Sequence, residues 1–155
     1  MRIHLLSIGG RMPGWVGEGF AEYAGRMPPN LPLQLVELPL AQRGKSSDPA
    51  RVLEQEGRRM LKAIPERAHV VALEPGGRTL GTEQMAQRLQ DWLPLGCDVA
   101  LLIGGPDGLA PACRARADES WSLSKLTFPH MLVRVVIAEQ LYRAWTIIQN
   151  HPYHR

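Results

Sequence analysis

Short runs of apolar residues alternate with longer amphipathic stretches along the chain. The short runs predict strands at residues 2–8, 33–38, 69–74, 98–104 and 120–123. The amphipathic stretches predict helices at residues 15–26, 48–63, 82–93, 109–117 and 132–149. Alternation of strands with crossover helices is typical of an α/β fold. Because the runs at 69–74 and 98–104 are apolar on both faces, we expect a mainly parallel sheet covered by helices on each side.

Capping and helix-breaking residues set several of these boundaries. Asp48 is a suitable N-cap because Pro49 follows at the first helical position, and Thr82 is expected to cap the next helix in a similar way, followed by Glu83. Pro65 and Pro94 are expected to end the helices that precede them.

The helix predicted at 132–149 has an unusually broad apolar surface. This surface is wider than packing on one sheet requires, so the helix is either central to the core or shared between the sheet and a second subunit. Arg134 stands opposite the polar side, where it either extends to solvent or meets an anion or the preceding loop. The polar side consists of Glu139, Gln140, Arg143, Thr146 and Asn150.

Composition predicts one compact domain over residues 1–155. The chain is 45% hydrophobic and 21% charged, with a net charge of +3, which excludes a disordered protein. No apolar run is long enough for a membrane span, and the N-terminal segment predicts a strand rather than a signal peptide. Cys97 and Cys113 form no metal or disulfide motif, and the histidines are scattered, so we expect no metal site and a cytoplasmic location.

Basic residues give a sequence pI of about 9.2 and gather at residues 43–45, at residues 58–59, at Arg114 and Arg116, and at residues 151–155. A basic excess of this size is compatible with a solvated surface or with nucleic-acid binding. The phosphate-contacting surface expected for the second alternative comprises residues 43–47 with Arg2, Arg11, Arg58 and Arg59.

Three turn-rich segments, 74–77, 104–108 and 122–130, follow predicted strands. Ligands of open α/β sheets bind beyond the carboxyl ends of the strands, so these segments predict a binding cleft, although any one of them alone is compatible with a structural turn. The chain lacks a Walker loop, a GxGxxG fingerprint and a GxSxG elbow, which disfavours NTP hydrolysis, NAD binding and a serine nucleophile. Cys113 is expected to be a buried helix residue rather than a nucleophile.

Three signatures in this order resemble the RlmH family of small bacterial SPOUT-class methyltransferases, which act on a pseudouridine of 23S ribosomal RNA. They are LLIGGPDG at 101–108, WSLSKLTFPH at 121–130 and EQLYRAWTIIQNHPYHR at 139–155. The resemblance extends to Gly14-Trp15 and to Arg43-Gly44-Lys45, so it covers essentially the whole chain.

The resemblance implies a SPOUT-type α/β fold with a C-terminal trefoil knot, a homodimer, and S-adenosylmethionine as methyl donor. General topology rules would not predict the knot. Adenine is expected in an apolar slot formed by Leu73, Leu123, Leu126 and Phe128. The full set of residues expected to hold the donor is Leu73, Gly104, Gly105, Leu123, Ser124, Lys125, Leu126, Thr127 and Phe128.

Methylation of the imide nitrogen N3 requires loss of its proton and groups that hold the base and its phosphates. The C-terminal residues offer such groups: His154 titrates in the useful range, Tyr153 can stack on or hydrogen-bond the base, and Arg155 and Arg143 can bind phosphate or the anionic imide. The resemblance implies that one subunit's tail completes the pocket of the other.

Glu139 and His130 are further site candidates, although Glu139 can equally pair with Arg143 and His130 can cap the last helix. The expected substrate is 23S rRNA in assembled ribosomes. The alternatives are another RNA, such as tRNA, or a non-catalytic protein that binds RNA or ribosomes.

Overall fold

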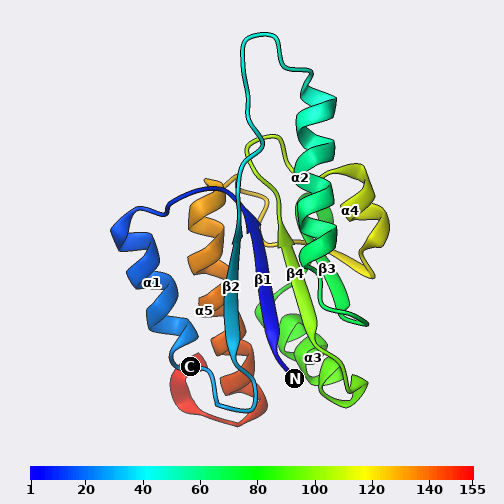
Figure 1. Ribbon diagram of the computed structural model, residues 1–155. Coiled ribbons are helices and arrows are strands. Elements are labelled where there is room, and N and C mark those ends of the chain that lie inside the picture. Colours follow the sequence, from blue (N-terminus) through cyan, green and yellow to red (C-terminus); the bar gives the residue numbers. More distant parts are fainter.

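The computed structural model describes all residues from 1 to 155 and shows a five-stranded parallel sheet with strand order β2-β1-β4-β3-β5 (Figure 1). The strands are β1 (Ile3–Ile8), β2 (Leu33–Leu38), β3 (His69–Thr79), β4 (Val99–Ile103) and β5 (Glu119–Ser122). The helices are α1 (Gly14–Ala24), α2 (Pro49–Ala63), α3 (Thr82–Trp92), α4 (Pro111–Arg116) and α5 (His130–Ile148), with short 3-10 turns η1 (Leu93–Leu95) and η2 (Pro152–His154). The predicted α/β class and mainly parallel sheet are therefore confirmed.

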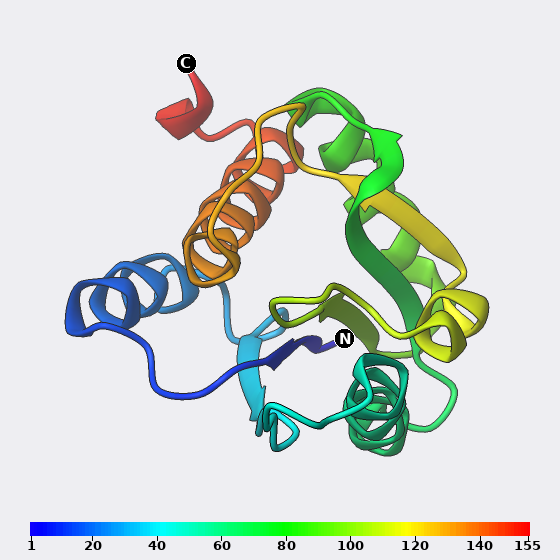
Figure 2. The ribbon, with the colours of Figure 1, turned by 90° about the horizontal axis from the view of Figure 1, so that it is seen from above.

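Helices cover both faces of the sheet. Seen from above, α1, α3 and α5 lie on one face, and α2 and α4 lie on the other (Figure 2). Successive side chains of β4 alternate between two hydrophobic clusters: Leu101 belongs to the cluster that includes α1, α3 and α5, and Leu102 to the cluster beneath α2 and α4. Every residue of β4 is buried, as the apolar pattern of this strand predicts.

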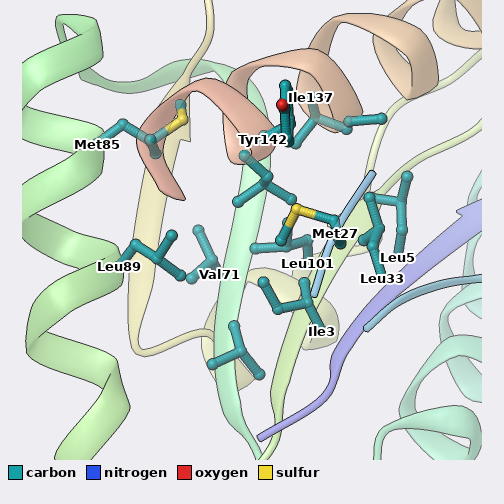
Figure 3. Close-up of a cluster of buried hydrophobic side chains, with 14 of the residues drawn as sticks. Ile3, Leu5, Met27, Leu33, Val71, Met85, Leu89, Leu101, Ile137 and Tyr142 are labelled. Carbon is teal, nitrogen blue, oxygen red and sulfur yellow. The ribbon is translucent and has the colours of Figure 1, made fainter. Parts of the chain in front are cut away.

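The larger cluster joins the sheet to α3 and α5. Val71 and Leu101 of the sheet, Leu89 of α3 and Ile137 of α5 come together in its interior (Figure 3). All four side chains are fully buried, and burial of one such side chain contributes about 2 kcal/mol. The position of α5 on the sheet is thus set by apolar packing, and that position fixes the two ends of the helix relative to the strands.

The segment that follows the apolar part of β3 differs from the prediction. Glu74-Pro75-Gly76-Gly77 was expected as a turn, but it continues the strand to Thr79, with a shift of register against β5. A Cβ atom on Gly77 would lie 2.5 Å from the backbone carbon of Trp121. The glycine therefore permits close passage of two backbones rather than a reversal of the chain.

The helix caps were predicted correctly at α2 but not at α3. Asp48 caps α2, where its Oδ1 accepts a hydrogen bond of 3.0 Å from the Ala50 N–H. Thr82 is the first residue of α3 rather than its cap: Gly81 occupies that position and donates its N–H to Gln84 Oε1 at 2.9 Å. The Thr82 hydroxyl instead donates to Gln140 of α5.

Two polar side chains of α5 are buried. Arg134 is fully buried and meets an anion, one of the two expected alternatives: its Nη1 lies 3.1 Å from Glu37 Oε2, and its Nε donates to Ser7 Oγ at 3.0 Å. Thr146 was placed on the polar side, but it is fully buried, and its hydroxyl is satisfied there by donating to the Arg143 carbonyl. No helix of this chain combines the length and the hydropathy needed to cross a membrane.

Candidate active site

A cavity of about 450 Å³ lies at the carboxyl ends of the strands, where three segments distant in sequence converge. We call it the edge cavity. Its walls come from β3, from the loop between β4 and α4, and from the loop between β5 and α5. The lining includes all nine residues expected to hold a donor: Leu73, Gly104, Gly105, Leu123, Ser124, Lys125, Leu126, Thr127 and Phe128.

The loop after β4 folds tightly back on itself. A Cβ atom on Gly104 would overlap the backbone of Gly108, so no larger side chain fits there. Gly108 has a φ of +81°, which favours glycine, and its N–H donates to the Gly105 carbonyl at 3.0 Å. Glycine at 104 and 108 thus lets the backbone itself form one wall of the edge cavity.

The loop after β5 is held by hydrogen bonds within itself. The Ser122 hydroxyl donates to the Ser124 carbonyl, and the Leu126 N–H donates to Ser124 Oγ, both at 2.9 Å. These bonds turn the loop so that the Leu126 side chain is 73% exposed at the cavity. The edge cavity therefore has an exposed apolar group available to a planar ligand.

The cavity lining contains one carboxylate, which is paired with an arginine, and one histidine. Glu74 is its single carboxylate, and its Oε2 lies 2.6 Å from Arg114 Nε. The Ser120 hydroxyl donates to the other oxygen of Glu74 at 2.7 Å. Burial lowers the pKa of His130, and the positive charge of Arg134 lowers it further, which favours a neutral imidazole at the edge cavity. His130 is the first residue of α5 and makes no capping hydrogen bond.

Arg43 ties the loop after β4 to α2. Its Nη2 donates to Glu56 Oε1 at 2.7 Å and to Asp107 Oδ2 at 2.9 Å. The hydrogen bond to Asp107 raises the pKa of Arg43, and so do the bond to Glu56 and both negative charges. Arg43 was expected to contact phosphate, but these two carboxylates already engage it; Lys45, two residues later, is exposed.

The expected catalytic residues gather at the opposite end of α5. The Tyr153 hydroxyl donates to Glu139 Oε1 at 3.1 Å, and the Arg143 guanidinium lies 4.9 Å from the centre of the Tyr153 ring. Arg143 also donates to Glu139, the helical pairing considered from the sequence. His154 is partly buried and Arg155 is exposed. Burial raises the pKa of Tyr153, and the bond to Glu139 raises it further, to about 12.

The edge cavity and the tail, residues 151–155, are therefore separated within one chain. The 19 residues of α5 lie between them and span about 28 Å at the usual helical rise. Figure 1 shows the C-terminus near the amino ends of the strands, whereas the cavity loops lie at the carboxyl ends. The structure groups the nine expected donor residues in one place and Arg143 with Tyr153 in another.

Sequence reasoning did not identify Glu74 and Arg114 as site residues. Glu74 directly follows Leu73 in a segment already considered as part of the cleft, which was a usable signal. Arg114 lies 40 positions later in a helix, and nothing in the sequence links it to Glu74. No group of three or more His, Cys, Asp or Glu side chains is arranged to hold a metal ion.

Comparisons with known proteins agree over the length of the chain. A family model described as "Predicted SPOUT methyltransferase" matches residues 1–154. The chain is 60% identical to ribosomal RNA large subunit methyltransferase H of Alkalilimnicola ehrlichii and 57% identical to the proteins of the same name from Thioalkalivibrio sulfidiphilus and Hahella chejuensis. Each alignment covers 100% of this chain and 99% of the relative.

A solved structure of a probable methylase family protein from Haemophilus influenzae Rd KW20 has a similar fold. It superposes with a TM-score of 0.58 at 11% identity, covering 99% of this chain and 70% of that protein. At this identity the similarity concerns the fold alone.

Proposed function

This chain belongs to the SPOUT methyltransferase family, and we propose that it methylates N3 of a pseudouridine in 23S rRNA within the ribosome, as a cytoplasmic homodimer. The donor of this family is S-adenosylmethionine. The SPOUT fold also implies a trefoil knot in the C-terminal part of the chain, which is rare among proteins. The observation that supports the proposal most strongly is the convergence of three distant segments on one cavity.

The edge cavity suits a nucleoside with a positively charged sulfur. Its volume of about 450 Å³ falls in the usual range for small-molecule sites. Leu73, Leu123, Leu126 and Phe128 supply apolar contacts for a purine, and the backbone around Gly104 supplies amide and carbonyl groups. These features support the assignment of the nine lining residues to donor binding.

Bound S-adenosylmethionine supplies an activated methyl group, so the protein has to position the base and accept the N3 proton. We assign proton transfer to His154, because the imidazole of histidine is the side chain that most often transfers protons in enzymes. With a pKa of about 12, Tyr153 stays protonated at neutral pH and acts as a hydrogen-bond donor or stacking partner. Arg143 and Arg155 hold the phosphate groups or the anionic imide.

The proposed tail residues can reach an edge cavity only in another copy of the chain. About 28 Å of helix separates them from their own cavity, and Tyr153 is held to α5 by Glu139. Apolar residues of α5, among them Leu132, Val136 and Trp145, remain partly exposed, as expected for a helix that packs on a second subunit. These features support a homodimer in which one tail completes the partner's cavity.

Methylation assays with defined RNA substrates test the proposed function. Purified protein and S-adenosylmethionine are incubated with free 23S rRNA, 50S subunits, 70S ribosomes and tRNA, and the nucleosides are analysed by mass spectrometry. We expect methylated pseudouridine in the ribosomal samples. Methylation of tRNA instead would select a different RNA substrate, and donor binding without transfer to any of these samples would contradict the proposal.

A further inference from the structure

Glu74 and Arg114 form an ion pair inside the edge cavity that no expected donor contact uses. Glu74 belongs to β3 and Arg114 to α4, and both side chains line the cavity. The Glu74 carboxylate is largely buried, with 17% of its side chain exposed, whereas the Arg114 side chain is 51% exposed. The two charges are therefore both accessible from the cavity.

We propose that Glu74 and Arg114 bind the amino-acid end of S-adenosylmethionine, Glu74 taking the ammonium group and Arg114 the carboxylate. This inference rests on the function proposed above, because it assumes that the donor occupies the edge cavity. In the free protein the two side chains pair with each other. The bound zwitterion presents the opposite charge to each of them, so both remain neutralised.

The composition of the lining supports this division of roles. Arg114 and Lys125 are both cations, so either could bind a carboxylate, but Glu74 is the single anion available to an ammonium group. The planar guanidinium of Arg114 matches a carboxylate with two parallel hydrogen bonds, which a lysine cannot provide. The Ser120 hydroxyl orients Glu74 through Oε1 and leaves Oε2 directed at Arg114.

The competing role for Glu74 is binding of the ribose hydroxyl groups, which carboxylates also recognise. Binding of two ligands, one with and one without the amino-acid end, distinguishes these two roles. S-adenosylhomocysteine carries adenosine and the complete amino-acid end, whereas 5′-methylthioadenosine carries adenosine without that end. A residue that holds the amino-acid end affects only the first ligand, and a residue that holds the ribose affects both.

Isothermal titration of both ligands tests the inference with Glu74→Gln and Arg114→Gln. We expect each substitution to lower the affinity for S-adenosylhomocysteine about 10-fold, because a partly exposed, charge-assisted hydrogen bond is lost. The affinity for methylthioadenosine should stay within about twofold of that of the unmodified protein. Arg116→Gln, which removes a cation of the same helix outside the edge cavity, is the matched control and should change neither affinity. Decarboxylated S-adenosylmethionine should bind Arg114→Gln as well as it binds the unmodified protein.

The possible failures are distinguishable. Equal weakening of both ligands by Glu74→Gln would assign Glu74 to the ribose and overturn the inference, as would unchanged affinity for S-adenosylhomocysteine in both variants. If the unmodified protein bound neither ligand, the proposed function itself would fail. Thermal unfolding of each variant shows whether a change in affinity reflects a change in folding.

Discussion

At the scale of single residues, Glu119 joins β5 to α3 through an unusual number of hydrogen bonds. Its two carboxylate oxygens accept bonds from His69, Arg88, Trp92 and Trp121. Burial by itself raises the pKa of Glu119, but these bonds outweigh it, led by the bond from Arg88, and lower the pKa to about 2. The ionised carboxylate therefore contributes to the stability of the fold.

This contribution predicts a defined dependence of stability on pH. The pKa of Glu119 rises from about 2 in the folded chain to its usual value near 4.5 on unfolding, so the stabilisation is complete above pH 4.5 and declines as the pH falls toward 2. Its full size is roughly 3 kcal/mol. The free energy of unfolding in urea should be lower for Glu119→Gln than for the unmodified protein by about this amount at pH 7. Below pH 4.5 this difference between the two proteins should become smaller. A difference that stayed constant down to pH 3 would contradict this account.

The proposed role of His154 gives a second prediction for a single residue. Replacing it with Ala should reduce methyl transfer to ribosomes by about 100-fold, because proton transfer by a positioned side chain contributes at least this much. The affinity for S-adenosylhomocysteine should not change, since we assign His154 to the target base and none of the nine residues assigned to the donor belongs to the tail. Full turnover by His154→Ala would remove this residue from the mechanism.

At the scale of elements, the contact between α2 and α4 depends on a glycine within a helix. A Cβ atom on Gly57 would lie 2.5 Å from the Cβ of Ala110. Helix propensity alone favours alanine over glycine by about 1 kcal/mol. Overpacking costs about 1 to 3 kcal/mol, and in this contact it opposes the gain in propensity.

We therefore predict that Gly57→Ala destabilises the protein despite its better helix propensity. The expected net loss is about 1 kcal/mol in the free energy of unfolding, measured by chemical denaturation, because the cost of overpacking exceeds the gain in helix propensity. The double variant Gly57→Ala with Ala110→Gly should recover most of it, because the second change removes the opposing Cβ. A Gly57→Ala protein more stable than the original would show that the two helices separate at little cost.

Elements with a strong local pattern were predictable, and those that depend on partners were not. The fully apolar strand β4 and the capped start of α2 follow from their own residues, Asp48 among them. The extension of β3 through Gly77 could not be predicted from its own residues, because glycine occurs both in turns and where two backbones pass close together. Only the neighbouring β5 decides between the two.

At the scale of the whole molecule, the edge cavity was predictable because parallel strands bring their carboxyl ends to one side of a sheet. The pairing of Glu74 with Arg114 was not, since it depends on how α4 crosses the neighbouring strands. The separation of the tail from the cavity was implied by the helix predicted at 132–149 and by the family resemblance, but not by the residues of the tail. Residue types in the tail suggest chemistry, but only the orientation of α5 shows where that chemistry lies.

Mixing two inactive variants tests whether the tail acts on the partner. One variant lacks residues 151–155, and the other carries Leu123→Arg, which obstructs the edge cavity. After the subunits are exchanged at equal amounts, half of the dimers are mixed and each has one complete site, so activity should return to about one quarter of the original. A tail that served its own chain would leave the mixture inactive. Size-exclusion chromatography should confirm that both variants form dimers.

The length of α5 then has a consequence beyond its own chain. As a rigid rod, the helix sets the reach of the tail, just as the loops around Gly104 set the location of the donor. Inserting one residue would turn everything beyond it by about 100° and advance it by about 1.5 Å. In a dimer in which each active site contains the partner's tail, such an insertion in one subunit would displace the catalytic residues from the active site of the other. The donor pocket of the altered subunit would stay intact.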